Sequence, residues 1–127
     1  MKACLLFLTV AMSIVSVHES FGQNQTERFN AMVAPQRDAV GDCYKAQTSR
    51  FAALSCEPAE TVVDAAFGRC VAFEKAYKDV MVMNTDAEFM SIADAIVAKT
   101  KITIRQFLLA RVLEVRLQAG RCSGNSN

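Results

Sequence analysis

Four cysteines in the body of the chain, Cys43, Cys56, Cys70 and Cys122, constrain the fold more than any other feature. An even number of cysteines in a small exported chain is typical of two disulfide bonds, for which three pairings exist. Zinc is the competing use of four cysteines, but structural zinc sites usually contain a Cys-x-x-Cys pair, and this sequence has none. The cysteines therefore favour a small domain held by two disulfides.

Two helical patterns flank a turn at Cys56-Glu57-Pro58 and predict a helix hairpin. Pro35 is expected to begin or kink the helix before the turn, and Pro58 fits the first position of a second helix that runs to about Met83. Glu74 to Lys78 and Lys75 to Asp79 have the spacing of ion pairs on the exposed face of that second helix. Its inward stripe is expected at Val63, Ala66, Phe67, Cys70, Phe73, Tyr77 and Val80/Met81.

The hairpin also predicts how the cysteines pair. Cys43 and Cys70 lie almost equally far from the turn, and antiparallel helices bring such positions to the same level. Small residues beside both cysteines allow the close approach that a disulfide needs. We therefore expect the Cys43–Cys70 bond, and the Cys56–Cys122 bond follows by elimination.

The C-terminal part of the chain is also helical in pattern. Thr85 to Glu88 has the spacing of a capping box and predicts a helix start there. The residues 99–104 are rich in β-branched side chains, which are weak helix formers. Two alternatives stay open: one helix continues through Thr100–Thr103, or a fourth helix begins near Ile104. The Cys56–Cys122 bond favours a kink near Thr100 over a full reversal.

Almost no stretch alternates polar and apolar residues as a half-buried strand would. The sequence thus predicts an all-α fold: a small bundle of three to four helices with an antiparallel hairpin core, stapled by disulfides. We expect one helical domain over residues 23–122 and a disordered tail over 123–127.

The first residues have the layout of a secretory signal. Lys2 precedes an apolar run from Ala3 to Val17, and small residues follow, so we expect cleavage after Gly22. An uncleaved membrane anchor is the alternative, but the run is shorter than the ~20 residues that a spanning helix needs. The expected location is the periplasm or the cell exterior, with residues 1–22 removed.

Several classes of chemistry have little support in the sequence. The single histidine, His18, lies in the expected signal segment, so the exported chain has no histidine nucleophile pair or metal ligand. The carboxylate pairs Asp38/Asp42 and Glu60/Asp64 are typical of solvated helix faces. Met81, Met83 and Met90 could favour Cu(I), but core filling is the commoner use of methionine. We expect no enzyme, no cofactor and no metal.

The C-terminal segment is both basic and strongly apolar. From residue 99 onward there are six Lys or Arg residues and one acid, Glu114. We select Lys99, Lys101, Arg105, Arg111 and Arg116 as a candidate surface for an anionic partner. The competing interpretation is that these cations pair with the acidic earlier helices and that the apolar excess is buried in the bundle or in a homodimer.

The segment from Ser55 to Cys70, with Cys43 upstream, resembles small exported helical proteins of proteobacteria that have a cysteine-bridged helix hairpin. The resemblance implies a periplasmic setting and carries no functional residues. We expect a non-enzymatic protein that binds another protein, in an envelope-stress, inhibitor or immunity role. A binder of anionic lipid or of a membrane surface is the second hypothesis, and an enzyme of unrecognised type is the third. No nucleic-acid partner is expected.

Overall fold

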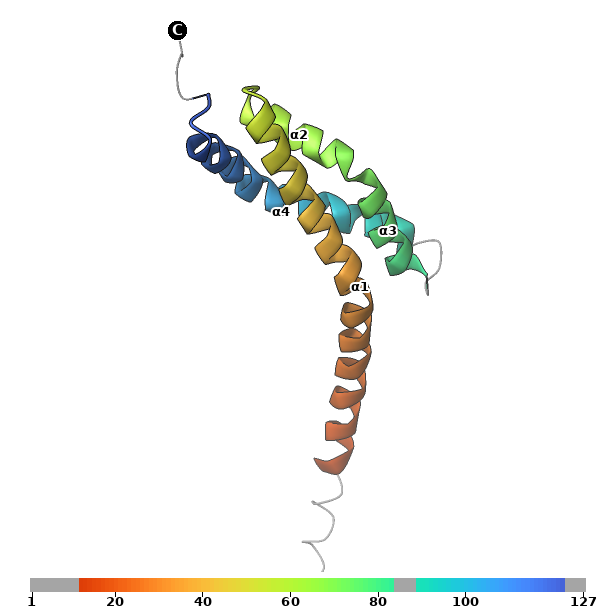
Figure 1. Ribbon diagram of the computed structural model, residues 1–127. Helices are drawn as coiled ribbons and strands as arrows, with labels where there is room; N and C mark the ends of the chain where they lie inside the picture. The colour runs from red at the N-terminus through yellow and green to blue at the C-terminus, as the bar shows by residue number, and fades with distance from the viewer. Residues whose placement is uncertain (1–11, 84–88, 123–127) are drawn as a thin grey trace, which may run out of the picture. The chain divides into compact units, whose positions relative to one another are not determined.

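The computed structural model describes residues 12–83 and 89–122, and within them it is all-α (Figure 1). The helices are α1 (Met12–Leu54), α2 (Ala59–Arg69), α3 (Val71–Val82) and α4 (Phe89–Gln118). The chain divides into two compact units, Met1–Ala34 and Pro35–Asn127. The predicted disulfide-stapled helix bundle is confirmed. The expected capping box at Thr85 and the expected tail lie outside the described residues.

The helix before the hairpin turn does not begin at Pro35. The first unit contributes the part of α1 up to Ala34, and α1 continues through Pro35 as an internal proline. Proline is costly inside a helix because it has no N–H group for the preceding turn. Pro35, where the sequence predicts a helix start or a kink, lies instead inside α1 at the boundary between the two units. The predicted cleavage point after Gly22 also lies within α1.

The hairpin turn forms where the sequence predicts it. The backbone N–H of Ser55 donates to the Phe51 carbonyl and ends α1, and the N–H of Glu57 donates to the Ser55 hydroxyl at 3.0 Å. Pro58 is the N-cap, with φ −47° and ψ 144°, so α2 begins one residue later than expected. Glu60 lies in the first turn, near the positive end of the helix dipole.

The single helix predicted after the turn is two helices, because the chain departs from helical geometry at Cys70. Cys70 has φ −101° and ψ 8°, and its N–H donates to the Phe67 carbonyl three residues earlier. This tighter last turn ends α2, and the Cys70 carbonyl then accepts from Phe73 and Glu74 as α3 begins. The residue that breaks the helix is the one that is bonded to α1.

The β-branched run near Thr100 does not interrupt α4. The Thr100 hydroxyl donates to the Ile96 carbonyl at 2.9 Å, and the Thr103 hydroxyl donates to the Lys99 carbonyl at 3.0 Å. Both hydroxyls are thus satisfied by the preceding turn of the same helix. The hypothesis of a fourth helix beginning near Ile104 is therefore wrong, and one helix continues through Thr100–Thr103.

The core of the second unit lies between the later part of α1, the helices α2 and α3, and α4, against which α2 and α3 both pack. Its largest fully buried side chains are Tyr44, Leu108, Val40, Val63, Val112, Thr48 and Cys70. Disulfides join Cys43 to Cys70, with 5.9 Å between Cα atoms, and Cys56 to Cys122, with 5.5 Å. Both pairs are as predicted, the first from the hairpin geometry and the second by elimination. Within residues 12–83 and 89–122, no helix has the length and hydropathy of a membrane span.

Candidate functional site

The cations that the sequence selects as an anionic-partner surface are largely engaged inside the second unit. Lys101 forms an ion pair with Glu74 of α3 at 2.9 Å, and Arg105 forms one with Asp64 of α2 at 2.6 Å. The Arg105 guanidinium donates to Asp64 and holds the pKa of that carboxyl below its ordinary value. These contacts join α4 to the two helices against which it packs.

Two further arginines of this set also have internal partners. Arg111 donates to the Ser49 hydroxyl of α1 at 3.1 Å and pairs with Glu114 at 2.7 Å. Arg116 donates to the Ser55 carbonyl at 2.8 Å and also to the Glu57 carbonyl. Within the described part of the chain, Lys99 is the one member of the set that makes no ion pair or hydrogen bond through its amine.

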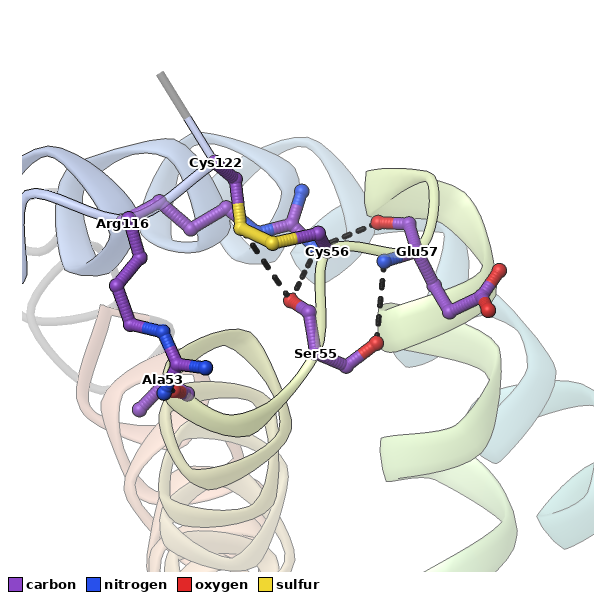
Figure 2. The surroundings of a disulfide bond; sticks show 7 residues. Ala53, Ser55, Cys56, Glu57, Arg116 and Cys122 are labelled. Carbon is purple, nitrogen blue, oxygen red and sulfur yellow. Dashed lines mark hydrogen bonds between the residues drawn. A yellow bond between two sulfur atoms is a disulfide. The ribbon is translucent and has the colours of Figure 1, made fainter. Parts of the chain in front are cut away.

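The Cys56–Cys122 bond fixes the end of α4 against the hairpin turn. In Figure 2 the disulfide lies beside the Ser55 carbonyl, and Arg116 reaches the carbonyls on both sides of Cys56. Arg121 donates to the Ala53 carbonyl at 2.9 Å. Arginine side chains thus satisfy carbonyl groups at the end of α1 and in the turn, which the helix itself leaves without partners. This region is a structural anchor.

A buried polar cluster connects three helices and is absent from the sequence predictions. The Tyr44 hydroxyl of α1 donates to Glu74 Oε1 at 2.8 Å, and Lys101 of α4 pairs with the same oxygen. The Tyr44 and Phe67 rings meet edge to face at 4.8 Å between centroids, and the Lys101 amine lies 5.5 Å from the Phe67 centroid. Glu74 is therefore a buried carboxylate with a hydroxyl and an ammonium as partners.

This cluster corrects the expected role of Glu74. The sequence places Glu74 on the exposed face, paired with Lys78, but Glu74 is buried and Lys78 pairs instead with Asp94 of α4 at 2.8 Å. The inward residues of α3 are Glu74, Tyr77 and Met81, while Phe73, expected inside, is exposed. The Lys75–Asp79 pair on the exposed face is confirmed at 2.6 Å.

The electrostatics of the cluster indicate a structural role. Burial raises the pKa of Tyr44 above its ordinary value, and the hydrogen bond to Glu74 raises it further, because a phenolate would lie beside a carboxylate. Tyr44 therefore stays protonated as a donor and is a poor general base. Each of the three groups has its partner within the cluster, so none is left to bind or activate a ligand.

The exposed apolar side of α4 is the surface that burial inside this chain does not explain. Ile92, Ile96, Phe107, Leu113 and Leu117 lie on one side of the helix; we call this set the α4 outer face. Their exposed fractions are 46, 37, 56, 59 and 73%, respectively. Leu108 and Val112, on the opposite side of α4, are fully buried. The sequence predicts this apolar excess and leaves two interpretations open, a partner-binding surface or burial in the bundle or a homodimer. For these five side chains, burial in the bundle is wrong.

A shallow groove of about 560 Å³ follows the middle of this side of α4. It is lined by Ile96, Lys99, Thr100, Thr103, Ile104 and Phe107. Lys99, whose amine is the one among the five selected cations without a partner in the described residues, therefore lies in a groove whose other lining is mostly apolar. The arrangement suits an apolar partner that carries a negative charge near Lys99.

Among the residues that the structure describes, no three histidine, cysteine, aspartate or glutamate side chains converge as a metal site would require. Comparison of the chain with protein-family models, with curated proteins and with solved structures gives no match. The site hypothesis therefore rests on the geometry of α4.

Proposed function

We propose that this chain is an exported, non-enzymatic helical protein that binds another protein through the α4 outer face. One observation carries the proposal: five large apolar side chains share one exposed side of a helix whose opposite side is buried in the core. Exposed clusters of large apolar side chains on a small domain commonly mark an interaction site. The disulfides and the arginine contacts keep that helix fixed, so the face is presented in one conformation.

Export is supported by two independent features. Two disulfides persist in an oxidising environment outside the cytoplasm. The start of the sequence, with Lys2 before the apolar run from Ala3 to Val17, has the order of a secretory signal cleaved after Gly22. We assign the protein to the periplasm or the cell exterior, and the resemblance of Ser55–Cys70 favours the periplasm.

An anionic lipid surface is the second candidate partner, because Lys99 borders the apolar groove. Four of the five selected cations already have partners within the protein, which lowers the positive charge available to a membrane. Cosedimentation with anionic and with neutral vesicles at low salt separates the two candidates. Binding to anionic vesicles alone, lost on Lys99→Glu, would support lipid and contradict the protein-binding proposal.

The test is affinity capture. The protein is expressed with its own N-terminal segment so that it is exported and oxidised, and it is then immobilised on a resin. Partners from the cell envelope are identified by mass spectrometry and compared for wild type, Ile96→Asp and Leu113→Asp. Val71→Asp is the matched control, because Val71 is an exposed apolar residue on α3. We expect a defined partner that both α4 variants lose and the control retains. A partner retained by both α4 variants would overturn the assignment to this face.

A further inference from the structure

We infer that the α4 outer face pairs with the same face of a second copy of this chain, with the two α4 helices antiparallel. This inference rests on the proposed function, since it names the partner of that face. It is carried by the spacing of the residues along α4, by their exposure and by the position of two charges.

The first step is the spacing. Residues on the exposed side of α4 alternate in steps of four and three, which is the seam of a helix pair. The eight seam positions are Ile92, Ile96, Lys99, Thr103, Gln106, Ala110, Leu113 and Leu117. They span about 38 Å of helix at ~1.5 Å per residue. All of them except Lys99, Thr103, Gln106 and Ala110 are large apolar residues, and these four occupy the middle.

The second step is the exposure of the seam. The large apolar members Ile92, Ile96, Leu113 and Leu117 are between 37 and 73% exposed, and the polar and small members between them are exposed as well. Phe107 flanks the seam in its central turns and is 56% exposed. The seam is apolar at both ends and polar in the middle. Both ends become buried only if the partner has apolar residues at the same two positions along the helix axis.

The third step is orientation. In a parallel pair, Lys99 would lie beside the Lys99 of the other copy, and two like charges in the seam repel. In the antiparallel pair, Ile92 lies opposite Leu117 and Ile96 opposite Leu113. Each Lys99 then lies opposite the small residue Ala110. The antiparallel register thus matches apolar with apolar at both ends and separates the two amines.

The fourth step is charge complementarity. Side chains on a helix lean toward its N-terminus, so Lys99 leans along the antiparallel partner toward that copy's higher residue numbers. Glu114 lies four residues beyond Ala110, or about 6 Å along the axis, which is within the length of a lysine side chain. The Lys99 amine has no partner among the described residues. Glu114 pairs with Arg111 of its own helix, but its side chain is 52% exposed and so remains open to a second cation. The two-fold arrangement forms this contact twice.

The test is the mass of the exported, oxidised protein in solution, measured by sedimentation equilibrium over a dilution series. We expect twice the mass of one chain at high concentration and dissociation on dilution. Leu117→Asp and Ile96→Asp each weaken the dimer by at least about tenfold, because every substitution occurs twice in a symmetric interface. Val71→Asp on α3 leaves the dimer unchanged, and circular dichroism checks that each variant is folded.

The charge pair gives a second, more specific test. Lys99→Glu and Glu114→Lys each weaken the dimer severalfold, and the double variant Lys99→Glu/Glu114→Lys restores a large part of the loss. A dimer in which the double variant is as weak as the two losses combined would overturn the antiparallel register. A parallel pair would instead be strengthened by Lys99→Ala, since the repulsion between the two amines would be removed.

The outcomes separate this inference from the proposed function. A single-chain mass at all concentrations overturns the dimer. The proposed function stands in that case if an envelope partner is still lost on Ile96→Asp. A dimer that persists in Ile96→Asp and Leu117→Asp also overturns the inference, because another surface then forms it.

Discussion

The Tyr44 hydroxyl donates a hydrogen bond of 2.8 Å to Glu74, a residue 30 positions later in the chain and buried in the helix bundle. The same Glu74 oxygen receives the Lys101 amine, so this one carboxylate connects α1, α3 and α4. A buried carboxylate is unfavourable unless its charge and its lone pairs are satisfied. The stability of the second unit should therefore depend on both partners.

Tyr44→Phe should lower the free energy of unfolding by about 1.5–3 kcal/mol, because a buried charged acceptor loses its hydroxyl donor. The measurement is urea denaturation followed by circular dichroism. Tyr77→Phe is the matched control, since Tyr77 is also buried but its hydroxyl makes no hydrogen bond to the described residues. Equal losses in the two variants would contradict a specific role for the Tyr44–Glu74 contact.

The same contact predicts a loss of stability at alkaline pH. The folded-state pKa of Tyr44 is raised above its unfolded value of 10.0, so the stabilisation is fully present below about pH 10. Above that pH the unfolded chain loses the phenol proton and the folded chain keeps it, which costs about 1.4 kcal/mol per pH unit until the folded pKa is reached.

Urea denaturation between about pH 9 and about pH 11, roughly one unit either side of the unfolded pKa, checks this expectation. The difference in unfolding free energy between wild type and Tyr44→Phe should shrink as pH rises. Tyrosinate absorbance from Tyr44 should appear together with the loss of helical signal. A difference that stays constant across this range would show that Tyr44 ionises in the folded protein.

The sequence could predict the two disulfides because cysteine pairing in a hairpin depends on distance from the turn. Cys43 and Cys70 are bonded as the position of Pro58 implies, and the remaining pair follows. The break at Cys70 was not predicted, since no proline marks it and the apolar spacing continues through it. The covalent bond to α1 lies at this point, and the sequence predicts that bond but not the departure from helical geometry that accompanies it.

The Glu74 cluster could not be found from helical periodicity. After Cys70, either Phe73 or Glu74 can follow on the inward side at helical spacing, and an apolar criterion selects Phe73. The actual choice depends on Tyr44 and Lys101, which are about 30 residues away in each direction. The sequence did contain one signal that Glu74 could be buried: at helical spacing, it lies on the same face as Tyr77 and Met81.

The basic segment shows the same limit. The sequence offered pairing with the acidic earlier helices as one interpretation of its charges, and Arg105 does pair with Asp64 of α2. It could not identify the individual partners, because Asp64, Ser49 and the Ser55 carbonyl lie in other elements. The continuity of α4 through Thr100 was left open for a local reason, since β-branched residues are weak helix formers. The contacts of α2 and α3 with α4 outweigh that weak preference.

Lys101→Met should be destabilising, and Lys99→Met should not. Lys101 neutralises the buried Glu74 and lies over the Phe67 ring, so its loss leaves a carboxylate with Tyr44 alone and should cost about 1–3 kcal/mol. Lys99 is exposed and has no such partner, so its substitution should change the free energy by less than about 0.5 kcal/mol. The double variant Lys101→Met/Glu74→Gln should recover part of the lost stability, because the unpaired charge is removed. Urea denaturation measures the free energy of unfolding of both variants. No recovery in the double variant would contradict this account.

The two disulfides should differ in how readily they are reduced. Cys70 is fully buried, whereas Cys56 and Cys122 are both exposed. The bond between the latter two lies beside the hairpin turn (Figure 2). Thiol attack requires access to a sulfur, so a mild reductant should open Cys56–Cys122 first. Alkylation of new thiols during a reduction time course, followed by peptide mass spectrometry, measures the order; earlier labelling of Cys43 and Cys70 would contradict it.

Each bridge should still contribute to stability through the unfolded state. The closed loops span 27 and 66 residues, so chain entropy predicts stabilisation of about 3.6 kcal/mol for Cys43–Cys70 and about 4.3 kcal/mol for Cys56–Cys122. Paired alanine variants, Cys43→Ala/Cys70→Ala and Cys56→Ala/Cys122→Ala, measure the two losses in urea. Removing the buried bridge also takes the sulfur of the fully buried Cys70 out of the core, so its loss should exceed the entropic value. Removal of the exposed bridge should give the entropic value or less, because Arg116 and Arg121 still hold the end of α4 against the turn.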